Sequence, residues 1–129
     1  ADGGVTINIA SVSGERPSPG TAAYGAAKAG LLNLTKSLAV EWAPKVRVVG
    51  ITCGMIRTEQ AHLHYGDEAG IASVEATVPL NRLATPADIG NACVFMASPL
   101  ASYISGSSLL VHGGGEKPAF LDAGNAHKS

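Results

Sequence analysis

The run VTINIA at residues 5–10 decides the fold that this sequence predicts. It is short, apolar and rich in β-branched residues, and Gly3 and Gly4 precede it, which is typical of a buried strand. Two further runs of this kind follow along the chain, VRVVGIT at residues 46–52 and SSLLVH at residues 107–112. The sequence therefore predicts three strands.

A long helix is predicted after the first strand. Residues 22–42 contain no proline and follow a loop that is rich in glycine and proline. Leu31, Leu34 and Leu38 recur at spacings of three and four residues, which predicts an apolar stripe along this helix. Small residues dominate positions 22–30, so this half of the helix should allow a neighbouring backbone to approach closely.

A second helix is predicted to begin at Thr85 and to run to about Ala97. Thr85 is a favourable N-cap residue, Pro86 suits the first helical position, and Asp88 can accept a hydrogen bond from an unpaired amide. Helices that alternate with strands in this order form a parallel sheet with helices on its faces. The fold class is therefore α/β.

The remaining segments are expected to be irregular. Residues 55–78 are mixed in character and predict a mobile loop, whereas residues 116–129 form a polar tail that acts as a lid or is simply loose. The sequence contains no internal repeat, and its length leaves no room for a second domain. We therefore interpret residues 1–129 as part of a single domain.

Composition restricts the class of partner. The formal net charge is −1 and no run of lysine and arginine occurs, so we expect no binding to nucleic acid or to a membrane surface. Cys53 and Cys93 lie 40 residues apart and form no paired motif, and the sequence shows neither a secretory signal nor a membrane-spanning segment. These features predict reduced thiols and a cytoplasmic location.

Three polar side chains are expected to converge at the carboxyl end of the sheet, where parallel α/β folds bind ligands. Tyr24 and Lys28 are four residues apart and so share one face of the first helix, and Ser11 follows the first strand. A phenol is a weak acid at neutral pH, but a nearby ammonium group stabilises the tyrosinate form. A serine hydroxyl can hydrogen-bond a carbonyl oxygen. Ser13 is an equally polar neighbour that is either a turn residue or the one that faces the substrate.

The segments NIASVSG at residues 8–14 and YGAAKAGL at residues 24–31 resemble the active-site segment of the short-chain dehydrogenase/reductase family. The resemblance implies that Tyr24 is the acid/base, that Lys28 stabilises the tyrosinate and holds the nicotinamide ribose, and that Ser11 polarises the substrate carbonyl. The spacing of these three residues matches the family and favours Ser11 over Ser13.

Later segments resemble the same family. VRVVGITCGMIRT at residues 46–58 is similar to the segment that contacts the nicotinamide carboxamide, which implies cofactor contacts for Gly54, Ile56 and Thr58. Residues 79–114 resemble the last helix and strand of the family. The fold implied is the C-terminal half of a Rossmann-type, doubly wound parallel sheet, of which three strands and two main helices are present.

The predicted mobile segment resembles the family's substrate-binding loop. We therefore expect His62 and His64, with Leu63 and Tyr65, to line the substrate entrance; the alternative is that the two histidines are merely solvated at the surface. Ser13 is a further candidate for a substrate contact. Two histidines at this spacing can chelate a metal, but no third ligand is set for zinc, so no metal site is predicted.

The function implied by the resemblance is an NAD- or NADP-dependent oxidoreductase that interconverts a carbonyl compound and an alcohol by hydride transfer. A homo-oligomer, either a dimer or a tetramer, is implied in the same way. The sequence contains no glycine-rich dinucleotide fingerprint, so the dinucleotide-binding half is expected to be absent from it. The alternative is a catalytically silent fragment that only folds or assembles with its missing half or with partner subunits.

Overall fold

The computed structural model describes residues 3–126. Within these residues the sheet consists of three strands, and helical segments lie between consecutive strands and after the last one. In chain order the elements are β1 (Gly4–Ser11), the 3-10 helix η1 (Val12–Gly14), α1 (Ala22–Glu41), β2 (Val46–Cys53), α2 (Ala61–Tyr65), α3 (Glu68–Thr77), α4 (Pro86–Ala97), the 3-10 helix η2 (Pro99–Ala101), β3 (Ser108–Val111) and α5 (Phe120–Ala123). The predicted strands and main helices are confirmed, with ends that differ by one residue.

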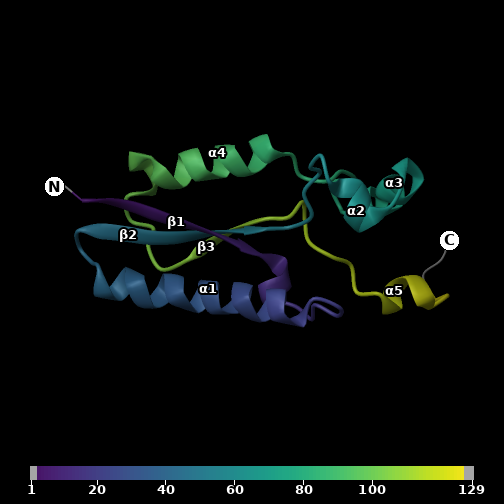
Figure 1. Ribbon diagram of the computed structural model, residues 1–129, viewed down its shortest axis with the longest axis horizontal. Helices are drawn as coiled ribbons and strands as arrows, with labels where there is room; N and C mark the ends of the chain where they lie inside the picture. Colours follow the sequence, from purple (N-terminus) through teal and green to yellow (C-terminus); the bar gives the residue numbers. More distant parts are fainter. Residues whose placement is uncertain (1–2, 127–129) are drawn as a thin grey trace.

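The three strands are parallel and lie in the order β1-β2-β3. Ser11, the last residue of β1, is opposite Cys53, and Cys53 is opposite Val111 on β3. All three carboxyl ends therefore lie at the same edge of the sheet, toward α2, α3 and α5 (Figure 1). The predicted α/β class is confirmed.

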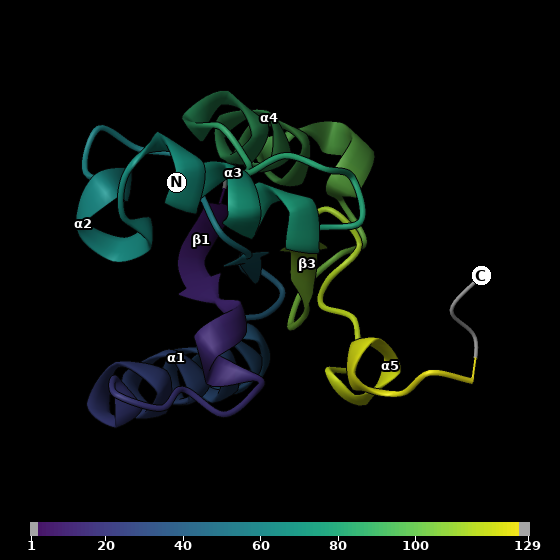
Figure 2. The same ribbon diagram turned by 90° about the vertical axis from the view of Figure 1, so that its right-hand side faces the viewer.

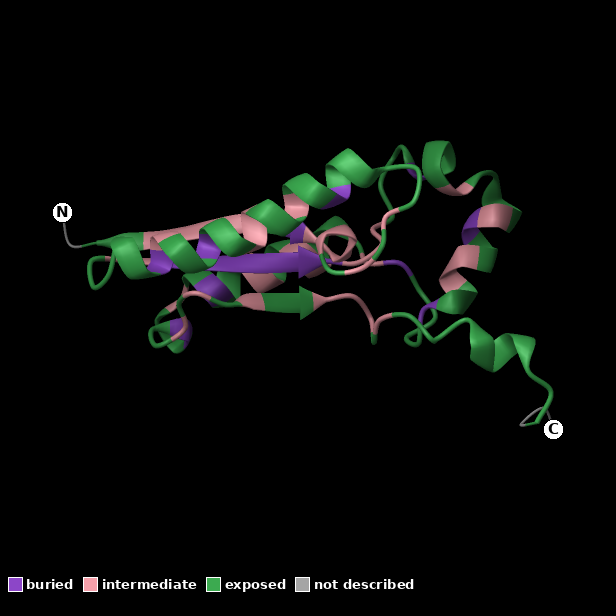
Figure 3. Cartoon of the chain, turned by 90° about the horizontal axis from the view of Figure 1, so that it is seen from below, coloured by how far each residue is buried: buried purple, intermediate pink, exposed green. Residues whose placement is uncertain are grey.

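Two helices cover the sheet, α1 on one face and α4 on the other (Figures 1 and 2). The core beneath α4 contains alternate residues of β2, because successive side chains of a strand point to opposite faces. It consists of Val49, Ile51, Cys53, Met96 and Ala101. The central strand is buried along most of its length, whereas β1 and β3 are less protected (Figure 3).

Helix α4 begins as the sequence predicts. Thr85 Oγ1 accepts a hydrogen bond from the backbone N–H of Asp88, and the Asp88 carboxylate accepts one from the N–H of Thr85. Arg82 also donates to that carboxylate over 2.6 Å. The Arg82 guanidinium, together with the Thr85 N–H, holds the pKa of Asp88 well below its usual range. The negative charge is therefore maintained at the positive end of the helix.

The predicted leucine stripe of α1 is wrong in part. Leu34 is 47% exposed, whereas the buried residues of this helix are Gly25, Thr35 and Ala39. Small side chains let α1 lie close to the sheet, and Asn8 of β1 donates a 3.0 Å hydrogen bond to Thr35 Oγ1 across that contact. The leucine spacing is a correct helical signal, but it does not identify the face that packs on the sheet.

The expectation of an irregular loop over residues 55–78 is wrong, because this segment contains α2 and α3. Asp67 caps α3 by accepting a hydrogen bond from the N–H of Gly70 over 2.9 Å. Ile71 and Val78 are buried in a second apolar cluster with Ala61 and Leu83. Burial of these side chains stabilises two helices that are too short to be stable alone.

The described part of the tail, residues 116–126, has regular structure as well. It contains α5, and Glu116 forms an ion pair with Arg16 near the other end of the sequence. Residues 127–129 of the predicted tail lie outside the described residues. Within residues 3–126, no helix combines the length and the apolar character needed to cross a bilayer.

Candidate functional site

A cavity of about 420 Å³ lies at the carboxyl ends of β1 and β2. It brings together six of the residues expected at the site or its entrance, namely Ser11, Ser13, Tyr24, Gly54, His64 and Tyr65. Its other lining residues are Val12, Arg16, Thr21 and Met55. The topology of a parallel α/β sheet places a ligand site at this end.

Tyr24 and Lys28 occupy successive turns of α1. The Lys28 ammonium lies 5.6 Å from the centroid of the Tyr24 ring, and the Tyr24 side chain is 50% exposed. Lys28 Nζ donates a 3.0 Å hydrogen bond to the carbonyl oxygen of Ile9 on β1. This bond fixes the ammonium between the helix and the strand, and two of its protons remain for other acceptors.

Ser11 connects β1 to η1. Its Oγ accepts a 3.1 Å hydrogen bond from the backbone N–H of Ser13 and so caps η1. The hydroxyl proton of Ser11 is still free to donate to an acceptor in the cavity. Both serines line that cavity, so the geometry does not separate their roles.

Gly14 holds the serine loop against α1. A Cβ atom at this position would lie 2.8 Å from the carbonyl carbon of Lys28 and 2.7 Å from the backbone nitrogen of Ala29. Only glycine allows the two backbones to approach this closely. The distance between the loop that carries Ser11 and the helix that carries Lys28 is therefore set by backbone contact.

The three residues proposed to contact the cofactor carboxamide lie in different surroundings. Gly54 lines the cavity, and a Cβ atom there would come within 2.7 Å of the Cβ of His112. Ile56 pairs with Ala84 in a single parallel bridge and packs against the main core. Thr58 lies in a separate surface hollow, where its Oγ1 accepts a hydrogen bond from the N–H of Gln60.

The two histidines also separate. His64 lines the cavity, whereas His62 and Leu63 are exposed on α2 and lie outside the set of lining residues. Within residues 3–126, no three histidine, cysteine, aspartate or glutamate side chains gather in one place.

Cys53 is buried at the end of β2. Its burial is the main cause that raises the pKa of its thiol, and the nearby Cys93 adds to that shift.

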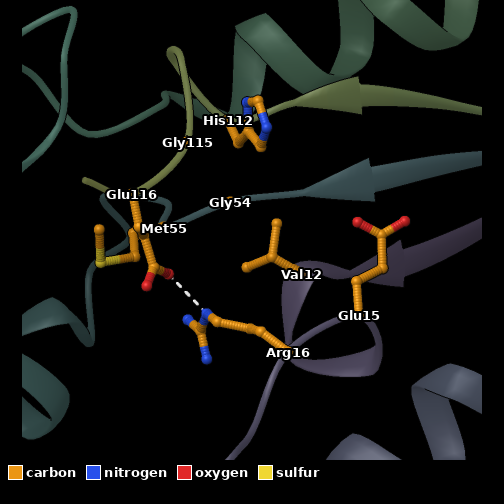
Figure 4. Close-up of a pocket in the computed structure, with 8 residues that line it drawn as sticks. All are labelled: Val12, Glu15, Arg16, Gly54, Met55, His112, Gly115 and Glu116. Atoms are coloured by element: carbon orange, nitrogen blue, oxygen red, sulfur yellow. Dashed lines mark hydrogen bonds and ion pairs between the residues drawn. The ribbon is translucent and has the colours of Figure 1, made fainter. Parts of the chain in front are cut away.

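Arg16 is the main lining residue that the sequence analysis missed. Its Nε donates to the Glu116 carboxylate, so the loop after β1 is joined to the segment after β3 (Figure 4). Burial raises the pKa of the Tyr65 phenol, while Arg16 opposes that shift and Tyr24 adds to it. A cation two residues after the serine loop was the available sequence signal, but its partner lies 100 residues away.

Comparison with known proteins agrees with this geometry. A family model described as enoyl-(acyl carrier protein) reductase matches residues 1–116. A curated relative from Sinorhizobium fredii, an uncharacterized short-chain type dehydrogenase/reductase, is 42% identical over 87% of this chain and 21% of its own length. The chain belongs to the short-chain dehydrogenase/reductase family. It spans less than half the length of the curated family members that it matches.

Solved structures of this family have the same arrangement of strands and helices. A 4-hydroxyisoleucine dehydrogenase in complex with NADH is 35% identical, with a TM-score of 0.78 over 85% of this chain and 46% of that one. A protein from Beutenbergia cavernae, solved with NADP at low occupancy, is 36% identical, with a TM-score of 0.81 over 88% of this chain and 46% of that one. The Rossmann-type fold predicted for the chain is confirmed.

Proposed function

We propose that this chain supplies the proton-transfer site of an NAD- or NADP-dependent oxidoreductase that interconverts a carbonyl compound and an alcohol. One observation carries the proposal: Tyr24 and Ser11 line a single cavity, and the Lys28 ammonium lies 5.6 Å from the Tyr24 ring centroid. Membership of the short-chain dehydrogenase/reductase family supports it.

Tyr24 acts as the acid or base. In the reductive direction its hydroxyl donates a proton to the substrate oxygen, and in the oxidative direction the tyrosinate removes that proton from the alcohol. The Lys28 ammonium stabilises the tyrosinate, because an opposite charge a few ångströms away favours the charged form. Ser11 donates a hydrogen bond to the same substrate oxygen, where negative charge develops.

The polar groups of this site fit the nicotinamide end of the cofactor. Lys28 retains two ammonium protons beyond its bond to Ile9, and with the half-exposed Tyr24 hydroxyl it offers donors that suit ribose hydroxyl groups. The segment containing Gly54, Ile56 and Thr58 would hold the carboxamide, with Gly54 nearest the cavity. When bound, the nicotinamide supplies the hydride to the carbonyl carbon or removes it from the alcohol carbon.

The whole enzyme requires more than these residues. The pyrophosphate of the cofactor needs a glycine-rich turn that this sequence does not contain, so we assign pyrophosphate binding to a dinucleotide-binding half within the same domain.

We also propose that the whole enzyme is a cytoplasmic homo-oligomer, a dimer or a tetramer. Exposed apolar side chains on α1, at its C-cap and on α4, such as Leu34, Trp42 and Val94, are available for subunit contacts.

Replacing Tyr24 with phenylalanine in the full-length protein that contains this chain tests the proposal. Loss of the phenolic proton should lower kcat by about 100- to 10,000-fold, the usual contribution of general acid–base catalysis. Tyr103→Phe is the matched control, because Tyr103 is fully exposed and should be dispensable. Steady-state turnover of a panel of ketones and alcohols provides the measurement, and undiminished turnover by a folded Tyr24→Phe protein would refute the assignment.

A second candidate is a catalytically silent fragment that only folds or assembles with another polypeptide. The observation that favours it is the unpaired edge of β1, which hydrogen-bonds to β2 on one side only within the described residues. Ile9 on this strand is 43% exposed, although an isoleucine in a strand is usually buried. Turnover by the isolated 129-residue chain would eliminate this candidate.

A further inference from the structure

The wall of the proposed substrate cavity carries basic side chains and no acidic ones. Of the ten described residues that line it, Arg16 has a permanent positive charge and His64 is a second basic group. None of the ten is an aspartate or a glutamate. Glu116, which lies outside this set, offsets part of the Arg16 charge, but the guanidinium has further N–H donors, and these suit an anionic group on the substrate.

Arg16 makes two hydrogen bonds within the protein. Its Nε donates to Glu116, and its Nη1 donates to the carbonyl oxygen of Pro17 over 3.3 Å. Glu116 lines a neighbouring cavity of about 290 Å³, whose walls include four residues of the first cavity, Val12, Arg16, Gly54 and Met55 (Figure 4). The carboxylate thus approaches the Nε side of the guanidinium, and the N–H groups of Nη2 remain for another acceptor.

Arg16 also shares its cavity with the proposed reacting end. Ser11, Tyr24 and Arg16 line the same 420 Å³ space. Burial has the largest effect on the pKa of the Tyr65 phenol and raises it. Arg16 lowers that pKa and Tyr24 raises it, so both residues interact electrostatically with Tyr65. A substrate carbonyl at Ser11 and Tyr24 therefore leaves room for a second substrate group at Arg16.

We propose that the substrate is a carboxylic acid that bears the reacting carbonyl or alcohol group, and that Arg16 binds its carboxylate. The inference rests on the proposed function, because it takes Ser11 and Tyr24 as the reacting end. Guanidinium and carboxylate groups form strong, directional hydrogen bonds, so Arg16 selects oxo acids and hydroxy acids over neutral ketones and alcohols. His64, from α2, adds a second donor on the same cavity wall.

Substrate discrimination in the full-length protein tests this inference. Acetoacetate and levulinate are compared with their methyl esters, which keep the ketone and lose the charge. The wild-type protein should show a higher kcat/KM for the acids, and Arg16→Gln should reduce the ratio of acid to ester by roughly 10- to 100-fold. Arg16→Lys should restore part of the ratio because it keeps the charge without the forked geometry.

Lys36→Gln is the control, since it removes the same charge from an exposed position of α1 outside the cavity. It should leave the ratio unchanged, and the ratio is insensitive to partial misfolding of any variant. Esters that are reduced as well as the acids, acids that are not turned over, or an acid preference that survives Arg16→Gln would each overturn the inference. If the inference about Arg16 fails but neutral ketones are still reduced and Tyr24→Phe abolishes that reduction, the proposed function remains supported. If Tyr24→Phe has no effect on turnover, the proposed function and the inference about Arg16 are both refuted.

Discussion

Two buried threonines on the α1 side of the sheet differ in their hydrogen bonding. Thr35 of α1 is 2% exposed, and its hydroxyl donates to the carbonyl oxygen of Leu31 and accepts from Asn8. Thr52 of β2 is fully buried, and its Oγ1 has no hydrogen-bond partner among the described residues. A buried hydroxyl without a partner costs free energy, whereas a bonded one does not.

Replacing each threonine with valine should therefore change stability in opposite directions. Thr52→Val removes an unsatisfied hydroxyl with little change of shape and should raise the free energy of unfolding by about 1 kcal/mol. Thr35→Val leaves the Asn8 amide without its acceptor and should lower it by about 1–3 kcal/mol. Chemical denaturation of the full-length protein measures both, and a destabilised Thr52→Val protein would mean that its hydroxyl has a partner in solution.

At the scale of single elements, the start of α4 makes stability depend on pH. The pKa of Asp88 is held well below its usual range, chiefly by the hydrogen bond from Arg82 and then by the Thr85 N–H. A carboxyl group whose pKa is lowered on folding stabilises the folded state above its unfolded pKa, and that contribution is lost as the pH falls. For Asp88 the loss takes place below about pH 4.

Asp88→Asn should lower the melting temperature at neutral pH, and the difference from wild type should shrink as the pH is lowered below about 4. Arg82→Gln separates the two interactions, because it removes the ion pair and leaves the capping box intact. A difference between wild type and Asp88→Asn that stays constant down to about pH 3 would show that the charge of Asp88 contributes nothing.

Elements with a local signature were predictable from the sequence. The three strands follow from short β-branched runs, and α4 follows from Thr85, Pro86 and Asp88 within four residues. Helix α3 was missed, although Asp67 as a cap and the spacing of Ile71, Val74 and Val78 were available as signals. The sheet-facing side of α1 could not be predicted, because glycine, alanine and threonine give no contrast with solvent-facing residues on a hydrophobicity scale.

In the candidate site, too, the features that depend on neighbouring residues in the sequence were predictable, whereas those that depend on distant residues were not. Tyr24 and Lys28 lie on adjacent turns of one helix, so their proximity could be predicted from a spacing of four residues. Arg16 could not be placed, because its orientation depends on Glu116, which joins it only after the whole sheet has formed. His62 and His64 are two residues apart on a short helix and therefore point in different directions, so only His64 lines the cavity.

On the scale of the whole molecule, the central strand β2 is paired on both sides within the described residues, whereas β1 and β3 are each paired on one side only. Both neighbours of β2 are edge strands, but β1 is twice as long as β3, with eight residues against four. A long edge strand with exposed backbone groups is a template for pairing with another strand. The outer edge of β1 is therefore where a dinucleotide-binding half would extend the sheet.

The isolated 129-residue chain should consequently associate in solution, and light scattering should give a mass above the 13.0 kDa of one copy. Ile9→Lys places a charge on the edge strand and should increase the monomer fraction of the isolated chain, because edge lysines oppose strand pairing. Gln60→Lys, which adds the same charge at an exposed position outside the sheet, should not. In the full-length protein Ile9→Lys should instead be destabilising, since the proposed dinucleotide-binding half would cover that position and the ammonium would lose its hydration. A gain of monomer in the isolated chain together with a loss of stability in the full-length protein would distinguish an edge that pairs with a specific missing strand from one that associates non-specifically. An isolated chain that is monomeric and unfolds cooperatively would show that β1 needs no neighbouring strand.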